Sequence, residues 1–405
     1  MNIIYIDHYA GSDRLGMEFR PYYIARELQD LGHQVLIIAG DYSHLRKVNP
    51  PIKYDYQVKD IEGVPFLFIK SGKYQGNGFD RVKSMIKFVR KIIKGKQKIL
   101  NILNPDAVIC SSTYPFDTYA GRSLAKASGA RLYHEIHDLW PLTPMELGGY
   151  SKYHPFIYTM QIAEKAAYKH SDKIISILPH VEPYIKGLGF DTEVVHIPNG
   201  LPAEYFEKLY PADSRVQNAI DDLKQKHSHV IAYAGGLSIS NAMIYFVEAF
   251  ERLGDPSIAG IIIGDGIEKE KLKNIVQQKQ LPIVFLDSIP KENIISSLQL
   301  ADSLYLGSTK NKLYQYGFGM NKMFDYLMAA KPVVMSVDGH HSPIHELNLA
   351  VIADPEDPEM IAQAIVQATN LSPERLREIK QKSPAFVNQK HHYAHLGRLF
   401  AETIQ

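Results

Sequence analysis

The feature that most constrains this chain is a regular alternation of short apolar runs with longer amphipathic segments. In the first half the apolar runs read as strands, and the stretches 20–31 and 157–171 read as helices. The strand candidates are residues 3–6, 35–39, 65–69, 107–111, 131–136, 173–177 and 194–197. Strands that alternate with helices in this way predict a parallel sheet covered by helices on both faces.

The same alternation starts again near residue 230, after a cluster of chain breakers at 198–202. The second series has strand candidates at 230–234, 258–263, 283–286, 303–306, 332–335 and 350–352, and helix candidates at 242–253, 268–279, 291–300 and 321–330. A chain of 405 residues is long for one core and suits two domains. We therefore predict two doubly wound, Rossmann-like α/β domains at 1–197 and 209–384, joined by a linker at 198–208.

Bulk composition narrows the setting in which the chain works. The apolar fraction of 45% and the charged fraction of 22% are ordinary for a soluble globular protein. The single cysteine, Cys110, excludes a disulfide framework and fits a reducing compartment. No apolar run approaches the roughly 18 residues of a membrane span, and no signal peptide precedes the first strand. These features predict a cytoplasmic protein.

Doubly wound sheets bind ligands at the carboxyl ends of their strands, so two facing domains predict a site in the cleft between them. The loop after the first strand, residues 9–18, contains Gly16 and Glu18 and leads into a helix. Backbone N–H groups at the start of that helix could face a diphosphate or a polar acceptor. A plain strand-to-helix turn explains the same residues. The glycines lack the G-x-G-x-x-G spacing, which argues against dinucleotide binding and against a dehydrogenase.

A second candidate site follows the strand at 131–136, where His137 and Asp138 stand side by side. At a strand's carboxyl end these side chains could hydrogen-bond sugar hydroxyls and stabilise a cationic transition state. A hydrogen bond that only stabilises the loop is the alternative. No further His or carboxylate keeps a ligand-like spacing nearby, so we expect no metal ion here.

The loop that joins the first strand and first helix of the second domain is rich in small and polar residues. It contains Gly236, Ser238, Ser240 and Asn241, which offer hydroxyls and backbone amides at the positive end of a helix. Such a loop can bind phosphate.

The most specific stretch spans residues 316–333, where a glycine loop containing Gly319 and Met320 opens a helix near Asn321. Lys322 stands in the first turn, where the helix dipole disfavours a cation unless it meets an anion such as a bound diphosphate. Asp325 lies three residues further on and near the same face, where it could accept both hydroxyls of a ribose. The alternative is a helix start with an ordinary surface ion pair.

This stretch resembles the nucleotide-binding signature of the family-4 glycosyltransferases. Gly317-Phe318-Gly319 and Lys331-Pro332-Val333 match that signature, and Asp325 falls where the family's second glutamate binds ribose. The family's first glutamate has no counterpart here. The motif Asn321-Lys322-x-Phe324-Asp325-Tyr326 is similar to a subgroup that transfers amino sugars in surface-polysaccharide synthesis.

Shorter likenesses follow in order along nearly the whole chain. They include the opening loop and helix from Gly16, the Glu135-x-His137-Asp138 segment, Ile197-Pro-Asn-Gly200 between the domains, and Gly264-Asp-Gly266. The resemblance implies a GT-B fold and retention of anomeric configuration without a metal or another cofactor. It also implies that a C-terminal helix, here 385–405, returns to the first domain. It places the nucleotide base near Phe285 to Ile289.

The stretch from Arg81 to Lys98 carries eight basic residues, and no acidic residue lies between Asp80 and Asp106. Apolar residues recur among them at roughly helical spacing, namely Val82, Met85, Ile86, Val89, Ile92 and Ile93. Such a helix can lie on anionic lipid. The alternative is a solvated basic face whose apolar stripe packs into the core. Only Phe88 interrupts the basic run with an aromatic ring, so we do not expect nucleic-acid binding.

Together the family resemblance and the basic stretch imply a retaining glycosyltransferase that works at the inner membrane surface. The donor would be a nucleoside diphosphate sugar, UDP-linked and with an N-acetylated amino sugar as one candidate. The acceptor would be a saccharide or a polyprenyl-diphosphate-linked sugar. His137, Lys322, Asp138 and Glu18 are the candidate catalytic residues. Two alternatives stay open: a GT-B sugar-nucleotide epimerase, and an inactive scaffold that binds nucleotide sugars.

Overall fold

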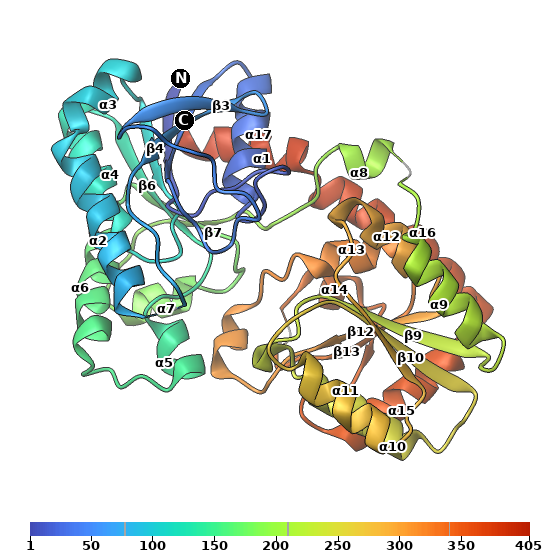
Figure 1. Ribbon diagram of the computed structural model, residues 1–405. Coiled ribbons are helices and arrows are strands. Elements are labelled where there is room, and N and C mark those ends of the chain that lie inside the picture. The colour runs from blue at the N-terminus through green and yellow to red at the C-terminus, as the bar shows by residue number, and fades with distance from the viewer. Residues whose placement is uncertain (77, 209, 340) are drawn as a thin grey trace. The chain divides into compact units, whose positions relative to one another are not determined.

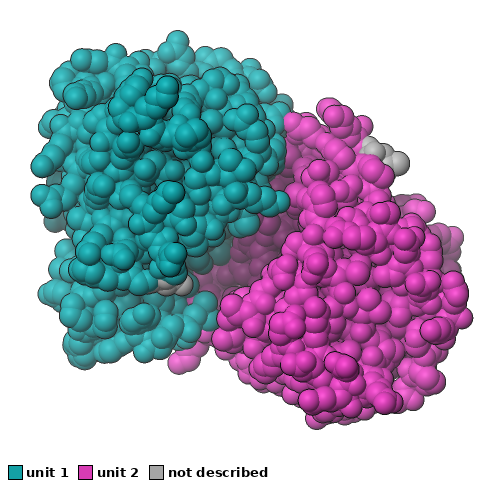
Figure 2. Space-filling view, in the orientation of Figure 1, with its two compact units in different colours: residues 1–199, 393–405 teal, residues 200–392 magenta. Residues whose placement is uncertain are grey.

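The computed structural model describes residues 1–76, 78–208, 210–339 and 341–405. The chain forms two compact units, the first made of residues 1–199 and 393–405 and the second of residues 200–392 (Figure 2). The helix Pro373–Lys390 (α16) belongs to the second unit, so the segment that returns to the first unit begins at 393 and not at 385 as predicted. The predicted start of the second domain, residue 209, lies outside the described residues.

The first unit is built on an eight-stranded sheet with strand order β3-β4-β2-β1-β5-β6-β7-β8 (Figure 1). Its strands are β1 (Asn2–Ile6), β2 (Gln34–Gly40), β3 (Gln57–Ile61), β4 (Val64–Ile69), β5 (Ala107–Cys110), β6 (Arg131–Ile136), β7 (Lys173–Ser176) and β8 (Val194–His196). All neighbours pair in parallel except β3, which pairs antiparallel with β4. Strand β3 is not among the strands predicted from the sequence, because its burial is mixed and its charged residues hide the strand pattern.

Helices cover both faces of this sheet, and the alternation of side chains along each strand decides which core each residue joins. The helices are α1 (Arg20–Asp30), α2 (Phe79–Lys94), α3 (Lys96–Ile102), α4 (Asp117–Ser128), α5 (Leu142–Gly148), α6 (Pro155–His170), α7 (Glu182–Gly187) and α17 (Tyr393–Ile404). On β1, Ile3 and Tyr5 face the core beneath α1 and α17. Ile4 and Ile6 face the opposite core, which α2 and α4 cover.

The second unit has a six-stranded parallel sheet with strand order β11-β10-β9-β12-β13-β14 (Figure 1). Its strands are β9 (His229–Ala234), β10 (Ile258–Ile263), β11 (Ile283–Leu286), β12 (Ser303–Gly307), β13 (Val333–Ser336) and β14 (Val351–Ile352). Strand order reverses beside β9, so the carboxyl ends of β9 and β12 form a topological switch point, where ligands bind in folds of this kind.

The helices of the second unit again form a layer on each face of the sheet. They are α8 (Glu204–Glu207), α9 (Ser214–Lys224), α10 (Met243–Leu253), α11 (Lys269–Gln278), α12 (Ile294–Leu298), α13 (Lys322–Ala329), α14 (Pro343–Leu347), α15 (Pro358–Thr369) and α16. Residues of α9 and α13 share one core with Ala232 of β9. Residues of α10 and α15 share the other core with Ile231 and Tyr233. The predicted fold class, two doubly wound α/β domains, is confirmed.

Candidate functional site

Two segments that lie far apart in the sequence meet at the carboxyl end of β9 in the second unit. The Nζ atom of Lys322, the first residue of α13, donates a hydrogen bond to Asn241 Oδ1 in the loop 235–241. Asn241 Nδ2 donates to Ser238 Oγ over 2.8 Å, and Ser238 Oγ lies 2.9 Å from Ser240 Oγ. The predicted phosphate-binding loop and the predicted diphosphate lysine therefore form one polar cluster.

Lys322 is a half-buried cation whose neighbours in this cluster are uncharged. Its Nζ lies 4.8 Å from the centre of the Tyr233 ring and 3.0 Å from the Tyr233 hydroxyl. Within the described part of the chain, no carboxylate lies within ion-pair distance of this amine. Burial lowers the pKa of Lys322 to about 7, because the charged form loses its hydration. A bound anion would supply the missing countercharge.

Close packing of two glycine loops keeps this polar cluster compact. A Cβ added to Gly235 would lie 3.2 Å from Lys322 Nζ. A Cβ at Gly264, which follows β10, would come within 1.9 Å of the Gly235 carbonyl oxygen, and one at Gly266 within 2.3 Å of the Leu237 carbonyl oxygen. The glycines of the Gly264-Asp-Gly266 segment are therefore required for the close approach of two backbones.

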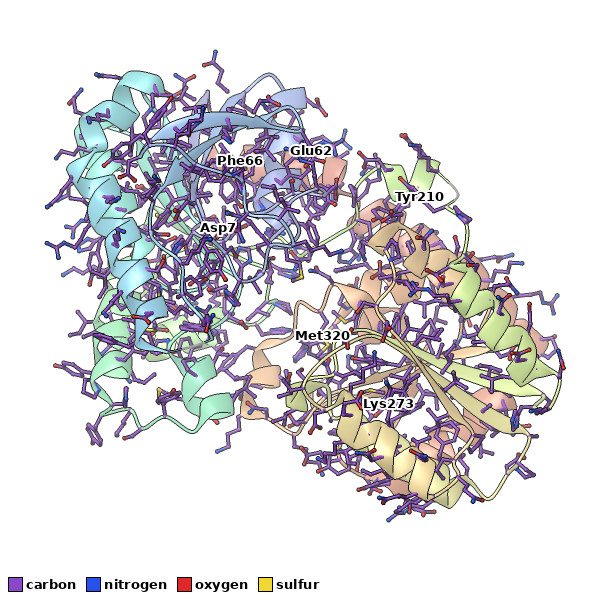
Figure 3. The ribbon with its side chains drawn as sticks, viewed as in Figure 1. Asp7, Glu62, Phe66, Tyr210, Lys273 and Met320 are labelled. Carbon is purple, nitrogen blue, oxygen red and sulfur yellow. The ribbon has the colours of Figure 1, made fainter. Side chains whose placement is uncertain are left out.

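Helix α13 begins next to this cluster and has no side-chain cap. Gly319 and Met320 form the preceding loop, where Met320 packs partly against the core of the unit (Figure 3). Asn321 takes the N-cap position, but its side chain makes no capping hydrogen bond. The amides of Met323 and Phe324 donate to the carbonyl oxygens of Met320 and Asn321. The positive end of the helix dipole at this point still favours an anion.

The predicted ribose-binding residue, Asp325, already holds a cation. Lys291, which follows β11, contacts both carboxylate oxygens of Asp325 with its Nζ atom. Burial raises the pKa of Asp325, and the charge of Lys291 opposes that rise. A ribose could bind Asp325 only by sharing this carboxylate with Lys291 or by displacing it. Phe285, expected near the base, lies in the edge strand β11 and packs partly against the neighbouring core.

In the first unit, His137 is the end of a buried polar network at the carboxyl ends of β1, β5 and β6. Its Nε2 atom lies 2.8 Å from Ser111 Oγ and 3.3 Å from Glu135 Oε2. Glu135 Oε1 accepts a 2.9 Å bond from Arg20 Nε in α1, and the Tyr5 hydroxyl also donates to Glu135. The network fixes the ring of His137 from inside the protein.

The ion pair between Arg20 and Glu135 determines which groups of this network are charged. Burial alone would raise the pKa of Glu135, but the positive charge of Arg20 and hydrogen bonds from His137 and Ser111 outweigh it and hold the pKa well below its usual range. Burial would lower the pKa of His137, and the bond to Glu135 together with nearby carboxylates reverses the sign and raises it. The ionised Glu135 carboxylate therefore favours the protonated form of His137.

The other predicted residues of the first unit lie around the same strand ends. Glu18 acts electrostatically, since its charge helps to raise the pKa of His137 and also that of Asp7, which burial lifts to about 7. Asp7 stands just after β1 (Figure 3). The side chain of Asp138 is exposed. The N–H of Gly16 donates to the Ser12 carbonyl over 2.8 Å, so this amide serves the loop and is not available to a phosphate.

Besides Arg20 and Tyr5 of the His137 network, three residues that the sequence patterns did not single out take part in these clusters: Tyr233, Lys291 and Ser111. Each lies in or just after a strand, where an alternating pattern marks it as an ordinary core or loop residue. Only the pairing of Lys291 with Asp325, of Tyr233 with Lys322 and of Ser111 with His137 reveals them. In the part of the chain that the structure describes, no group of three or more His, Cys, Asp or Glu side chains is placed to hold a metal ion.

The doubly wound sheets of both units match solved structures of the GT-B class over the whole chain. Sucrose-phosphate synthase from Thermosynechococcus elongatus superposes with a TM-score of 0.76 at 15% identity, over 99% of this chain and 98% of that one. Anabaena HepE in complex with UDP-glucose gives 0.67 at 15% identity, over 100% and 99%. An Escherichia coli trehalose-6-phosphate structure with bound UDP-2-fluoro glucose gives 0.69 at 13%, over 100% and 99%. The fold is GT-B.

Family profiles supply the class of protein. Residues 16–205 match Glycosyltransferase Family 4, and residues 228–370 match Glycosyl transferases group 1. The chain is therefore a GT-B glycosyltransferase with a family 4 domain followed by a group 1 domain, which confirms the resemblance at the level of the family. The narrower subgroup stays a prediction.

A curated relative is WcaI of Escherichia coli K12, which its name assigns provisionally to colanic acid biosynthesis as a glycosyl transferase. It is 25% identical over 197 residues. The match covers 46% of this chain and 48% of WcaI, so it spans about half the length of that relative.

Proposed function

We propose that this enzyme transfers a sugar from a UDP-linked donor to a saccharide or lipid-linked acceptor with retention of anomeric configuration. One observation carries the proposal. Lys322, a half-buried cation whose described surroundings supply no carboxylate, is joined to the hydroxyl-rich loop 235–241 at a topological switch point. A diphosphate satisfies the lysine, the loop and the start of α13 at once.

The second unit would hold the donor. Lys322, Ser238, Ser240 and the backbone of Gly236 would contact the diphosphate, together with the amides of residues 319–321. Asp325 would accept the ribose hydroxyls, and Phe285 would lie against the base. The barrier falls because charge that develops on the leaving diphosphate is met by donors already in place.

The first unit would act on the sugar and the acceptor. In the transfer, the bond from the anomeric carbon to the diphosphate oxygen breaks and a bond to the acceptor oxygen forms. The acceptor proton leaves with the diphosphate. His137 would donate a hydrogen bond to a hydroxyl of the donor sugar, while Glu18 and Asp138 would orient the acceptor. The printed name of WcaI supports a role in surface-polysaccharide synthesis.

The test is thermal unfolding of the full chain against a panel of nucleotides and nucleotide sugars. A ligand at 100 times its Kd stabilises the native state by about 2.7 kcal/mol, which raises Tm by several degrees. We expect a rise with UDP and a larger one with a single UDP-sugar. A rise in Tm with GDP or dTDP alone would mean that the donor carries that nucleotide instead of UDP. No rise with any nucleotide would contradict the proposal.

Two other functions give different outcomes in the same assay format. An epimerase would convert the bound UDP-sugar without any acceptor, and a scaffold would bind it without turnover. Product analysis with and without a crude lipid-linked saccharide acceptor separates these functions from transfer. A transferase forms free UDP in proportion to the glycosylated acceptor.

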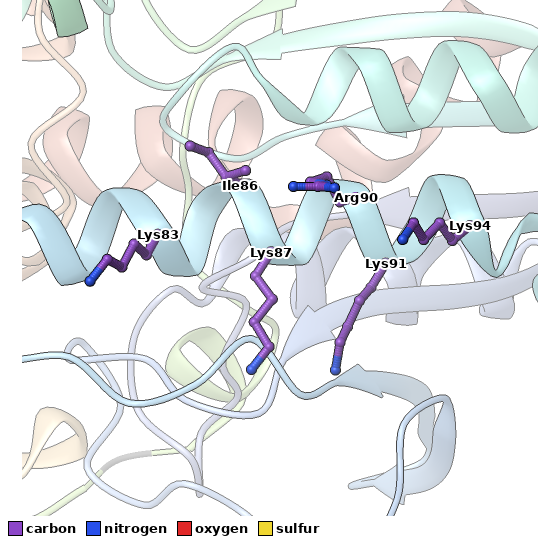
Figure 4. Close-up of a pocket in the computed structure, with 6 residues that line it drawn as sticks. All are labelled: Lys83, Ile86, Lys87, Arg90, Lys91 and Lys94. Atoms are coloured by element: carbon purple, nitrogen blue, oxygen red, sulfur yellow. The ribbon is translucent and has the colours of Figure 1, made fainter.

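We further propose that the basic face of α2 contacts anionic lipid. The apolar residues Met85, Val89 and Ile92 pack into the core, which is the alternative weighed above, whereas Ile86 is 46% exposed. Lys83, Lys87, Arg90 and Lys94 recur at i, i+4, i+7 and i+11, and they line a shallow groove on the exposed face (Figure 4). No helix in the described part of the chain is both long and apolar enough to cross a bilayer.

Exchange of these four basic residues for glutamine is expected to weaken vesicle binding. Each basic residue near an anionic surface contributes about 1 kcal/mol, so the loss is roughly 10²-fold or more. Cosedimentation with phosphatidylglycerol–phosphatidylcholine vesicles measures it, and pure phosphatidylcholine vesicles are the control. Unchanged binding of the variant would contradict the membrane contact.

A further inference from the structure

The first unit contains an apolar groove that none of the roles above uses. It has a volume of about 790 Å³ and lies between the start of α2, helix α5 and the start of α6. Its walls include Phe79, Met85, Trp140, Leu147 and Phe156. Among the described residues that line it, Arg81 is the only lysine or arginine, His154 is the only histidine, and none is a carboxylate.

The inner end of the groove reaches the carboxyl edge of the sheet. The guanidinium carbon of Arg81 lies 5.2 Å from the centre of the Tyr9 ring and 5.9 Å from the Trp140 ring, and its Nε donates to the Tyr9 hydroxyl over 3.2 Å. Tyr9 belongs to the loop after β1. Trp140 follows His137 by three residues. A cation is thus fixed where the groove meets the strand ends that carry the polar network.

The outer end of the groove opens among exposed apolar side chains. Phe79 is 73% exposed, and Leu147 and Tyr150 are each 47% exposed. Exposed apolar side chains that form one continuous patch are typical of a binding site for a ligand, a protein or a membrane. The groove is therefore cationic at its inner end, apolar along its walls and open to solvent at its apolar rim.

We propose that this groove binds the hydrocarbon chain of the acceptor lipid, with the phosphate attached to that chain held by Arg81. The inference rests on the proposed function and specifies its acceptor as a single-chain lipid phosphate or diphosphate. The polarity of the groove decides the orientation. An anionic head pairs with Arg81 near the strand ends, and the chain runs outward between α2, α5 and α6. The basic row of Lys83, Lys87, Arg90 and Lys94 lies on another face of α2 and is a separate feature.

Trp140 is the only tryptophan of the chain, so its fluorescence reports on the groove directly. The probe is monomeric dodecyl phosphate, titrated below its micelle concentration into the full-length protein. We expect saturable quenching or a blue shift of the Trp140 emission. Across octyl, decyl and dodecyl phosphate, affinity should rise roughly threefold to fourfold for each added methylene, because each one leaves water. Inorganic phosphate alone should give no change.

Head-group preference tests the role of Arg81. Dodecyl maltoside, with the same chain and a neutral head, should bind at least fivefold more weakly than dodecyl phosphate. Arg81→Gln should remove that preference and leave the affinity for dodecyl maltoside unchanged. Equal affinity of the wild type for both probes would overturn the assignment of an anionic head.

A matched pair of variants tests the apolar wall. Leu147→Glu places a carboxylate in the groove and should weaken dodecyl phosphate binding at least tenfold. Ile162→Glu is the control, since Ile162 is 49% exposed on α6, close to the 47% of Leu147, but does not line the groove. Both variants should keep their melting temperature because both positions are already exposed. Equal weakening in the two variants, or affinity that is independent of chain length, would overturn the proposal.

Failure of the groove proposal can be distinguished from failure of the proposed transferase function. UDP stabilisation depends on the second unit and should be the same in Leu147→Glu as in the wild type. If dodecyl phosphate binds with the expected chain-length dependence but no UDP-sugar is used, the groove stands and the transferase proposal falls. If transfer proceeds and dodecyl phosphate does not bind, the groove proposal is overturned alone.

Discussion

Replacement of Lys322 by alanine is expected to lower turnover by roughly 10²- to 10³-fold, the usual effect of removing one donor that meets developing negative charge. Its Nζ atom is the only cationic group recorded beside Asn241 and Tyr233 within the described residues. Because the lost amine is half-buried and has no carboxylate partner among the described residues, we expect the variant to fold normally. Steady-state transfer with the UDP-sugar found by thermal unfolding measures the effect.

The pH dependence of donor binding provides a sharper readout for the same residue. Burial places the pKa of Lys322 at about 7 in the unliganded protein, and a bound diphosphate stabilises the charged form and raises that pKa. Donor affinity should therefore be constant below about pH 7 and fall as the pH rises above it. In Lys322→Arg the guanidinium stays charged, so this fall should disappear.

Lys331→Ala is a suitable control, because Lys331 is also a partly buried lysine whose pKa burial lowers. It stands just before β13, at the amino end of that strand, on the edge of the sheet away from the polar cluster. We expect its turnover to stay within a few-fold of the wild type. Wild-type turnover in Lys322→Ala would contradict the proposed contact of Lys322 with the diphosphate. So would a pH profile of donor binding in Lys322→Arg that equals the wild-type profile.

Arg20→Met is expected to lower the free energy of unfolding by about 3–5 kcal/mol, because it leaves Glu135 as a buried carboxylate without its cation. The two side chains are 1% and 0% exposed, and their Nε–Oε1 distance is 2.9 Å. Arg20 also donates to the carbonyl oxygens of Ile197 and Pro198, at 2.8 and 2.6 Å, and these carbonyls would lose a partner. Urea unfolding of the full chain measures the loss.

The double variant Arg20→Met/Glu135→Gln separates the ion pair from simple packing. With the charge of residue 135 removed, the double variant should be less destabilised than Arg20→Met alone. Arg215→Met is the surface control, since the Arg215 side chain in its pair with Asp213 is 51% exposed, and we expect only a minor change there. If the double variant lost the sum of both single effects, the two residues would not be coupled and the network argument for His137 would fail.

The same network predicts where His137 can meet a substrate. Its Nε2 atom is engaged with Ser111 and Glu135 inside the protein, which leaves Nδ1 as the atom that would face a sugar hydroxyl. The sequence analysis identified His137 from its place after a strand, and that pattern says nothing about which ring nitrogen is available. The orientation of the ring and its tendency to bind a proton both come from Glu135, whose carboxylate Arg20 holds ionised.

Much of the fold follows from local pattern. Runs such as Ile258–Ile263 are buried on both faces and read as continuous apolar strands, and α1 and α10 carry apolar stripes at helical spacing. Errors arose where local pattern and tertiary contact disagree. Strand β3 has charged, half-exposed residues, and the last helix begins at Tyr393 because the apolar residues of 393–404 alone pack on the first unit.

The sequence by itself determined the two-fold repeat of strands and helices, the positions of the polar loops after strands, and the family to which both halves belong. It did so because strand and helix periodicity, chain breakers and glycine loops are local properties of the chain. Only the tertiary structure decided which of these loops meet: Lys322 with Asn241, Asp325 with Lys291, and Arg20 with Glu135. Each of these pairs is at least 30 residues apart, and its charge state depends on burial and on the partner, neither of which a local pattern contains.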